Sequence, residues 1–119
     1  MKTIIPLEHD EAVPLAEYLD ILKKQGRIEL FSHIPNETYT KSWNTKRKNK
    51  AEGVRAGVPD YIIVTKTKVL FLELKRVKGS TVSSEQREWF DKLGGKETVS
   101  AIAKGFDEAK EFVEGELVD

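Results

Sequence analysis

The stretch that decides the fold is DYIIVTKTKVLFLELK, residues 60–75. Two apolar runs, 61–64 and 69–75, flank a short polar segment of threonines and lysines. This pattern predicts two antiparallel strands joined by a hairpin turn. In such a hairpin, Asp60 at the start of the first strand lies opposite the Glu73 region of the second. The sequence therefore predicts that two carboxylates converge at one end of a sheet.

The second strand also ends in charged residues. Alternate residues of a strand share a face, so Glu73 and Lys75 point away from the side that Leu74 occupies. Two carboxylates beside an ammonium suit a hard divalent cation, which prefers oxygen ligands, and a neighbouring lysine can orient a water molecule. Two plainer interpretations stay open: a surface ion pair on a fraying edge strand, and Asp60 as a turn aspartate after Pro59.

The rest of the chain predicts an α/β fold, a mixed β-sheet flanked by helices, as one domain over residues 1–119. A serine-capped helix opens at Ser83 and Ser84 and stops at Gly94 and Gly95. We expect its Trp89 and Phe90 in the core. The basic segment 36–57 is predicted as a loop with a short helix around 46–52. The predicted order is α-β-β-β-α-β-α, with helices at 8–24, from 83 and at 106–114, and strands at 27–34, 61–64, 69–75 and 98–103.

Composition excludes several classes of protein. The chain has 39% hydrophobic and 34% charged residues, which is typical of a folded domain. It contains no cysteine, which excludes disulfide scaffolds, thiolate zinc sites and cysteine nucleophiles. Its two histidines are too few for most histidine metal cages. No apolar run approaches the roughly 20 residues of a membrane span, and residues 1–6 are too short for a secretory signal. We expect a cytoplasmic protein that binds no membrane.

Charge is balanced overall but unevenly distributed. Twenty basic residues cancel twenty acidic ones, yet Glu52 is the only acidic residue between positions 41 and 55, and the end of the chain is mainly acidic. This asymmetry predicts one basic surface that faces a polyanion, with a solvated basic loop as the alternative. Arg76 follows the charged strand end and is a further candidate for phosphate contact. The candidate DNA-binding residues are Lys46, Arg47, Lys48, Lys50, Arg55 and Arg76.

Several short motifs follow one another along the chain in the order found in a known nuclease family. The run Gly57-Val58-Pro59-Asp60, followed after residues 61–72 by Glu73-Leu74-Lys75, resembles the PD-(D/E)XK nuclease signature. The sequence motifs around this signature resemble those of the VRR-NUC family. Domains of that family occur in phage-type nucleases and as modules in larger repair enzymes. The resemblance implies a restriction-endonuclease-like core. The stretches that carry it are EHDE (8–11), HIPNET (33–38), GVRAGVPD (53–60), FLELKR (71–76) and SSEQ (83–86).

The resemblance implies roles for particular residues. Asp60 and Glu73 would bind Mg²⁺ or Mn²⁺, with the Leu74 backbone carbonyl as an additional ligand. Lys75 would position the attacking water and stabilise charge on the phosphate, and Gln86 would approach the site from its helix. An acidic residue of the first helix would complete the site. Glu8 and Glu11 share a helical face, and both remain candidates for that place.

The function implied is metal-dependent hydrolysis of DNA by an endonuclease without a small organic cofactor. A chain this short has no added DNA-reading domain, so recognition of DNA shape is expected rather than of sequence. Resembling junction-resolving enzymes are dimers, so we expect a homodimer acting on branched or junction DNA, with phage origin as one possibility. The alternatives are a non-catalytic nucleic-acid-binding module and a nuclease subunit that needs a larger partner. The complete trio of Asp60, Glu73 and Lys75 argues against a module that only binds.

Overall fold

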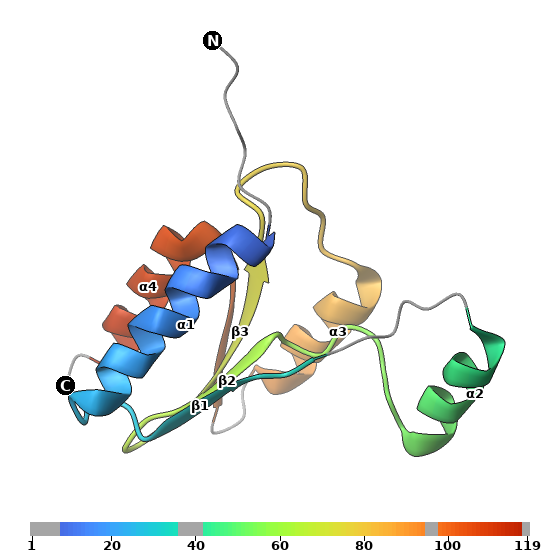
Figure 1. The fold of residues 1–119 in the computed structure, drawn as a ribbon, viewed down its shortest axis with the longest axis horizontal. Helices are drawn as coiled ribbons and strands as arrows, with labels where there is room; N and C mark the ends of the chain where they lie inside the picture. The colour runs from blue at the N-terminus through green and yellow to red at the C-terminus, as the bar shows by residue number, and fades with distance from the viewer. Residues whose placement is uncertain (1–7, 36–41, 95–97, 118–119) are drawn as a thin grey trace, which may run out of the picture.

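The computed structural model describes residues 8–35, 42–94 and 98–117 (Figure 1). Along the chain, the elements are α1 (Glu8–Lys24), β1 (Leu30–His33), α2 (Trp43–Glu52), β2 (Tyr61–Val64), β3 (Val69–Lys75), α3 (Ser84–Leu93), β4 (Thr98–Lys104) and α4 (Gly105–Glu116). The described residues contain no helix that is both long and apolar enough to cross a membrane.

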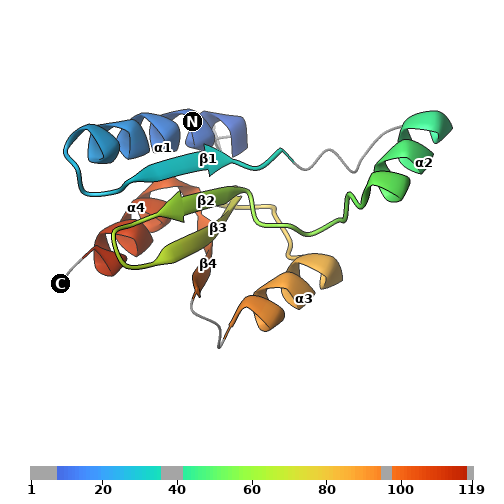
Figure 2. The same ribbon diagram turned by 90° about the horizontal axis from the view of Figure 1, so that it is seen from below.

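The four strands form one mixed sheet in the order β1-β2-β3-β4. β1 and β3 are antiparallel to β2, whereas β4 runs parallel to β3 and is reached through α3. The helices lie on both sides of this sheet, with α1 and α4 side by side on one side and α3 on the other (Figures 1 and 2). This confirms the predicted α/β fold with a mixed sheet flanked by helices.

The hydrophobic core lies between the sheet and the helix pair α1 and α4. Leu70, Leu72 and Leu74 of β3 are fully or almost fully buried there, as the alternation of the strand predicts. Leucines of α1 and small residues of α4 close over them. Their partners in the same cluster are Leu15, Leu19, Leu22, Ile28, Tyr61, Ile63, Ala103, Ala109 and Val113.

The β2–β3 hairpin is closed by Thr65. Its hydroxyl accepts hydrogen bonds from the backbone amides of Thr67 and Lys68, at 3.3 and 2.9 Å. A threonine hydroxyl that binds nearby amides stabilises a tight turn without help from other elements. The turn sets the strand register, in which Tyr61 pairs with Leu72. The predicted hairpin and its strand bounds are confirmed.

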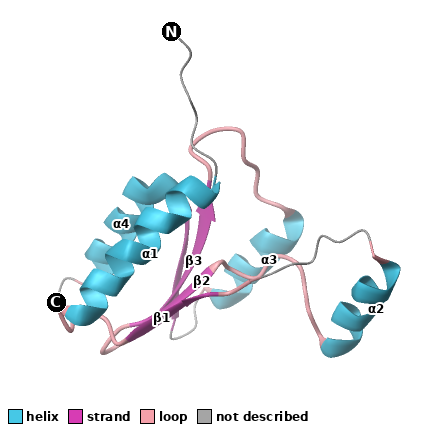
Figure 3. Cartoon of the chain, viewed as in Figure 1, coloured by secondary structure: helices cyan, strands magenta, loops and turns pink. Residues whose placement is uncertain are grey.

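The basic segment differs from the prediction. Residues 43–52 form a complete helix, α2, so the element order is α-β-α-β-β-α-β-α. The Ser42 hydroxyl accepts a hydrogen bond from the Thr45 amide at its start, and Gly53 ends it in a left-handed conformation. No residue of α2 is buried, and the helix lies apart from the sheet (Figure 3). A helix without an apolar face shows no hydrophobic periodicity, so its extent is not visible in the pattern.

Candidate active site

The hairpin register brings Asp60 next to the end of β3. Tyr61 pairs with Leu72 in the antiparallel register, so the preceding residue, Asp60, lies opposite Glu73. The Leu74 backbone amide donates a hydrogen bond to Asp60 Oδ2 at 2.9 Å, and the Ile34 amide donates to the Asp60 carbonyl at 2.6 Å. The carboxyl group and the backbone of Asp60 are therefore both held by neighbouring strands. His33 ends β1 on the same side; burial raises the pKa of Asp60, and the nearby His33 opposes part of that rise.

Glu73 is a buried acid with an incomplete set of partners. Its side chain is 3% exposed, and its Oε2 lies 3.5 Å from Lys75 Nζ, whose side chain is 11% exposed. The Gln86 side-chain amide donates a hydrogen bond to the same oxygen at 2.9 Å. The other oxygen, Oε1, is buried and has no hydrogen-bond partner among the described residues. A buried carboxylate oxygen without a partner is costly and calls for an explanation.

The pKa values of Asp60 and Glu73 also indicate that positive charge is missing beside these two carboxyl groups. Burial, followed by the nearby charge of Asp60, raises the pKa of Glu73 to about 8, although the Lys75 ammonium acts against this rise. Burial also raises the pKa of Asp60, and the hydrogen bond from the Leu74 amide offsets part of it. The two carboxyl groups therefore resist full ionisation at neutral pH unless more positive charge is supplied.

Helix α3 carries Gln86 to this pair. The Ser83 hydroxyl accepts a hydrogen bond from the Gln86 amide at 3.1 Å, and Gln86 Oε1 accepts one from the Ser83 amide at 2.9 Å. This is a capping box, which uses the side-chain oxygen of Gln86 and leaves the side-chain NH₂ group free to bind Glu73. One side chain thus begins the helix and contacts the buried acid. The predicted serine cap is confirmed.

Gly57 allows the segment before β2 to lie against α3. It has a φ of +89°, and a Cβ added there would stand 2.4 Å from the Glu85 carbonyl carbon and 2.6 Å from the Gln86 amide nitrogen. Those are backbone atoms of the first turn of α3, which cannot move aside without displacing Gln86. The glycine therefore has a packing role in addition to its turn conformation.

Gly57→Ala is expected to destabilise the protein more than Gly53→Ala does. Both glycines have left-handed φ angles, so alanine costs about 1 kcal/mol or more at either position. An added Cβ at Gly53 meets nothing within 4 Å, whereas at Gly57 it collides with α3. Urea unfolding of both variants measures the difference. Equal free energies of unfolding would show that the segment and α3 are not in close contact.

Among the acidic side chains of α1 that the structure describes, none forms a metal-binding group with Asp60 and Glu73. Glu11 Oε2 accepts a hydrogen bond from the Phe106 amide at 2.7 Å and so satisfies the N-terminus of α4. Within the described residues, no group of three or more histidine, aspartate and glutamate side chains is placed to hold a metal ion. Glu8 is the first residue of α1, and its side chain lies outside the described part of the chain.

The predicted DNA-binding residues fall into two groups. Helix α2 presents the lysines and arginine of 46–50 on a helix without buried residues, and Lys46 Nζ lies 5.4 Å from the ring centre of the exposed Trp43. Arg55 and Arg76 lie elsewhere, and each donates to nearby backbone carbonyls: Arg55 to those of Lys50 and Val54, Arg76 to that of Gly79. The structure does not bring all six residues onto one element.

The carboxylates present fit a hard divalent cation. Such an ion takes oxygen ligands and is commonly bound by only one or two protein carboxylates. Glu73 Oε1 has no hydrogen-bond partner in residues 8–35, 42–94 and 98–117, and the pKa values of both acids are raised. A bound cation would supply the missing partner and favour the ionised form of both acids. The hydrogen bond from the Leu74 backbone amide to the Asp60 carboxylate was not predicted from the sequence. The predicted strand register implies it, because the register places Asp60 beside the end of β3.

Comparisons with known proteins give one family. The model of the VRR-NUC domain matches residues 10–107, a range that includes Asp60, Glu73, Lys75 and Gln86. A solved structure described as a VRR_NUC domain protein is similar in fold, with a TM-score of 0.71 and 22% sequence identity. The similarity covers 100% of this chain and 94% of that one. No curated protein matches the sequence.

Proposed function

Since this chain belongs to the VRR-NUC domain family, a family of PD-(D/E)XK-type nuclease domains, we propose that it is a metal-dependent DNA endonuclease. Its site would consist of Asp60, Glu73 and Lys75, with Gln86 as a positioning residue. Domains of this type generally use divalent metals and act on DNA. The observation that carries the proposal is the buried Glu73 Oε1, which has no hydrogen-bond partner in the described part of the chain and lies beside a second carboxyl group and an ammonium.

Asp60 and Glu73 would hold Mg²⁺ or Mn²⁺, with the Leu74 carbonyl as a further oxygen ligand. A divalent ion lowers the pKa of a bound water and stabilises negative charge on a phosphate. The protein holds the ligands rigidly in place. The Leu74 backbone amide donates a hydrogen bond to Asp60 Oδ2, and the Gln86 side-chain NH₂ group donates one to Glu73 Oε2. Fixed ligands lower the cost of reorganisation when charge develops.

Lys75 would act on the substrate. Its ammonium lies on the same strand face as Glu73, 3.5 Å away, and is largely buried. A cation in such a site stabilises charge on the non-bridging phosphate oxygens more than it would in water. Lys75 can also orient the attacking water by hydrogen bonding. Its partial pairing with Glu73 keeps it in place before DNA binds.

Gln86→Ala is expected to slow cleavage and to lower the free energy of unfolding by about 1 kcal/mol, the usual cost of a lost cap. The matched control is Ser83→Ala, which removes the other half of the capping box and leaves the contact between Gln86 and Glu73. Urea unfolding and single-turnover cleavage are measured for both variants. If the two are equally stable and equally active, Gln86 serves only the helix cap.

Helix α2 would bind DNA phosphates. It lies apart from the sheet, has no buried residue and carries four basic residues within 46–50 (Figure 2). A polar helix of this length is marginal by itself, and phosphate contacts at its lysines would stabilise it. Because such contacts carry no sequence information, they fit an enzyme that reads DNA shape.

Replacing Lys46, Arg47 and Lys48 together with alanine is expected to weaken binding equally for unrelated DNA sequences. The log–log salt slope should flatten by up to about 0.9 for each lost phosphate contact. The control removes three charges at the other end of the molecule, Lys23, Lys24 and Lys66. An unchanged slope in the α2 variant would mean that DNA binds elsewhere.

The proposed substrate is branched DNA, and the proposed active form is a homodimer whose two sites cut both strands of a junction. The test uses the isolated chain with matched four-way junction, flap and linear duplex substrates in Mg²⁺, Mn²⁺ and EDTA. Cleavage in either metal, none in EDTA and faster cutting of branched DNA are expected, and light scattering should give twice 13.5 kDa. Binding without cleavage in both metals would identify a non-catalytic module, and cleavage restored only by a second protein would identify a dependent subunit.

A further inference from the structure

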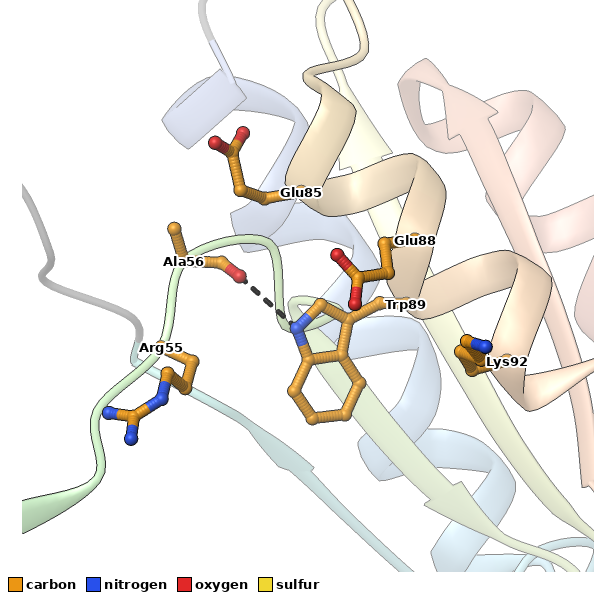
Figure 4. Close-up of a pocket in the computed structure, with 6 residues that line it drawn as sticks. All are labelled: Arg55, Ala56, Glu85, Glu88, Trp89 and Lys92. Carbon is orange, nitrogen blue, oxygen red and sulfur yellow. Dashed lines mark hydrogen bonds between the residues drawn. The ribbon is translucent and has the colours of Figure 1, made fainter.

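A pocket lies beside the candidate active site, between α3 and the segment that leads into β2. It has a volume of about 480 Å³, within the range of small-molecule sites. Figure 4 shows the side chains around it, which come from these two segments alone. The residues that line it are Arg55, Ala56, Glu85, Glu88, Trp89 and Lys92.

Trp89 is the aromatic wall of this pocket. The sequence predicted it as a core residue, but it is half-buried and no residue of α3 is fully buried. Its indole N–H donates a hydrogen bond to the Ala56 carbonyl at 3.1 Å (Figure 4). This bond satisfies the polar edge and fixes the plane of the ring. The ring is thereby left as a rigid apolar surface, which suits a flat ligand.

Both walls belong to segments that also carry site residues. Gln86, which contacts Glu73, precedes Trp89 by three residues, a rise of about 4.5 Å along the helix. Ala56, in the other wall of the pocket, lies four positions before Asp60 in the sequence. A strand of DNA with a phosphate at Asp60 and Glu73 would therefore bring a neighbouring nucleotide to the pocket.

The charges of the pocket suit a base better than a phosphate. Glu85 and Glu88 balance Arg55 and Lys92, whereas a phosphate site would be purely basic. Nucleobases present amino and imino donors for carboxylates and ring nitrogens and carbonyls for cations. In Figure 4 the Glu88 carboxylate points toward the Trp89 ring, so a stacked base would meet an acceptor at its edge.

We propose that this pocket binds one unpaired nucleobase next to the scissile phosphate, stacked on Trp89 with its hydrogen-bonding edge toward the flanking charged groups. The inference rests on the proposed function and narrows its substrate class. A base inside a continuous duplex is stacked on both faces and paired along its edge, so it cannot occupy the pocket without leaving the helix. The enzyme should therefore prefer DNA with an unpaired nucleotide beside the cut, as at bulges, flaps and branch points.

The test compares two bulged duplexes that differ only in one base. One carries a single unpaired nucleotide, and the other carries an abasic residue at the same position, so their length and charge are matched. Single-turnover cleavage by the wild type in Mg²⁺ is expected to be about tenfold faster with the base present, as one base stacked on an aromatic ring would give. Trp89→Phe should keep most of this preference and Trp89→Ala should lose it. Asp91→Ala, an exposed residue of α3 that does not line the pocket, should keep it.

A second measurement needs no change at Trp89. The chain has two tryptophans, so Trp43→Phe leaves Trp89 as the only tryptophan fluorophore. In EDTA, its emission should be quenched by a short single-stranded oligonucleotide and much less by the same strand with abasic residues. Quenching by contact with a base does not depend on catalysis.

The two arms separate failure of this inference from failure of the nuclease assignment. Equal cleavage of the base-bearing and abasic bulges, with equal quenching by both strands, would overturn the pocket while leaving the nuclease function intact. Absence of cleavage on every DNA in both metals would contradict the nuclease function, and quenching would then decide the pocket by itself.

Discussion

Replacing Lys75 with alanine is expected to slow single-turnover DNA cleavage by about 100- to 1000-fold, the usual effect of removing one preorganised charge-stabilising group. The ammonium lies 3.5 Å from Glu73 and is largely buried, so no solvent cation substitutes for it fully. DNA binding should persist, because the phosphate contacts of α2 are untouched. The readouts are cleavage of end-labelled DNA in saturating Mg²⁺ and a binding titration in EDTA.

Leu74→Ala is the matched control for this variant. Leu74 is the neighbouring residue, faces the opposite side of the strand and is 2% exposed. Its truncation should lower the free energy of unfolding by about 2–5 kcal/mol through loss of core contacts, with cleavage per folded molecule nearly kept. A Lys75→Ala protein that cuts as fast as the wild type would refute the proposed role of the lysine.

Asp60→Asn is expected to abolish cleavage and most of the thermal stabilisation by divalent metal, without lowering the melting temperature in EDTA at neutral pH. Asparagine keeps an oxygen that can accept the Leu74 amide hydrogen bond and removes the charge that repels Glu73. A metal that binds only the folded wild type stabilises it by about 2.7 kcal/mol at 100 times its dissociation constant. Melting curves in EDTA and in millimolar Mg²⁺ or Mn²⁺ measure both effects.

The same variant has a distinct pH profile in EDTA. The folded pKa of Glu73, about 8, exceeds its ordinary value of 4.5. Its contribution to stability is therefore complete below about 4.5 and is lost as the pH rises through about 8. Without the Asp60 charge the folded pKa falls, so Asp60→Asn should lose less stability than the wild type between pH 5 and 8.

Two other outcomes would contradict this account of Asp60. A variant that melts far below the wild type in EDTA would make Asp60 a structural turn residue, as its hydrogen bonds to β1 and β3 also permit. A variant that keeps the full metal-induced rise would place the ion elsewhere. Each outcome is separate from loss of cleavage, since melting does not require DNA.

The sequence predicts the hairpin and its carboxylate pair well because both depend on local rules. Alternation places Glu73 and Lys75 on one face, and the short turn sets the register that brings Asp60 opposite Glu73. The capping box at Ser83 is equally local and is found correctly. These features need no knowledge of how distant segments pack.

Features that lack a hydrophobic pattern, or that depend on tertiary contacts, are predicted less well. The bounds of α2 rest on its Ser42 cap and on Gly53, because the helix has no apolar face to reveal it. Trp89 has the spacing of a core residue, yet its partner is the Ala56 carbonyl, distant in sequence. Glu11 stays a predicted site acid of α1, and the sequence does not show that its carboxylate accepts a hydrogen bond from the Phe106 amide of α4, a contact set by how the two helices pack.

The most direct test of the metal-dependent site at Glu73 is single-turnover cleavage of end-labelled junction DNA by the wild type and Glu73→Gln across a range of Mg²⁺ concentrations. Glutamine keeps the shape and a hydrogen-bond acceptor for Gln86, and it removes the charge that the buried site tolerates poorly without a cation. We expect a wild-type rate that rises with Mg²⁺ to saturation, and a Glu73→Gln protein that folds at least as stably in EDTA but cuts at background level. A Glu73→Gln protein with the wild-type rate and the same Mg²⁺ dependence would contradict the assignment.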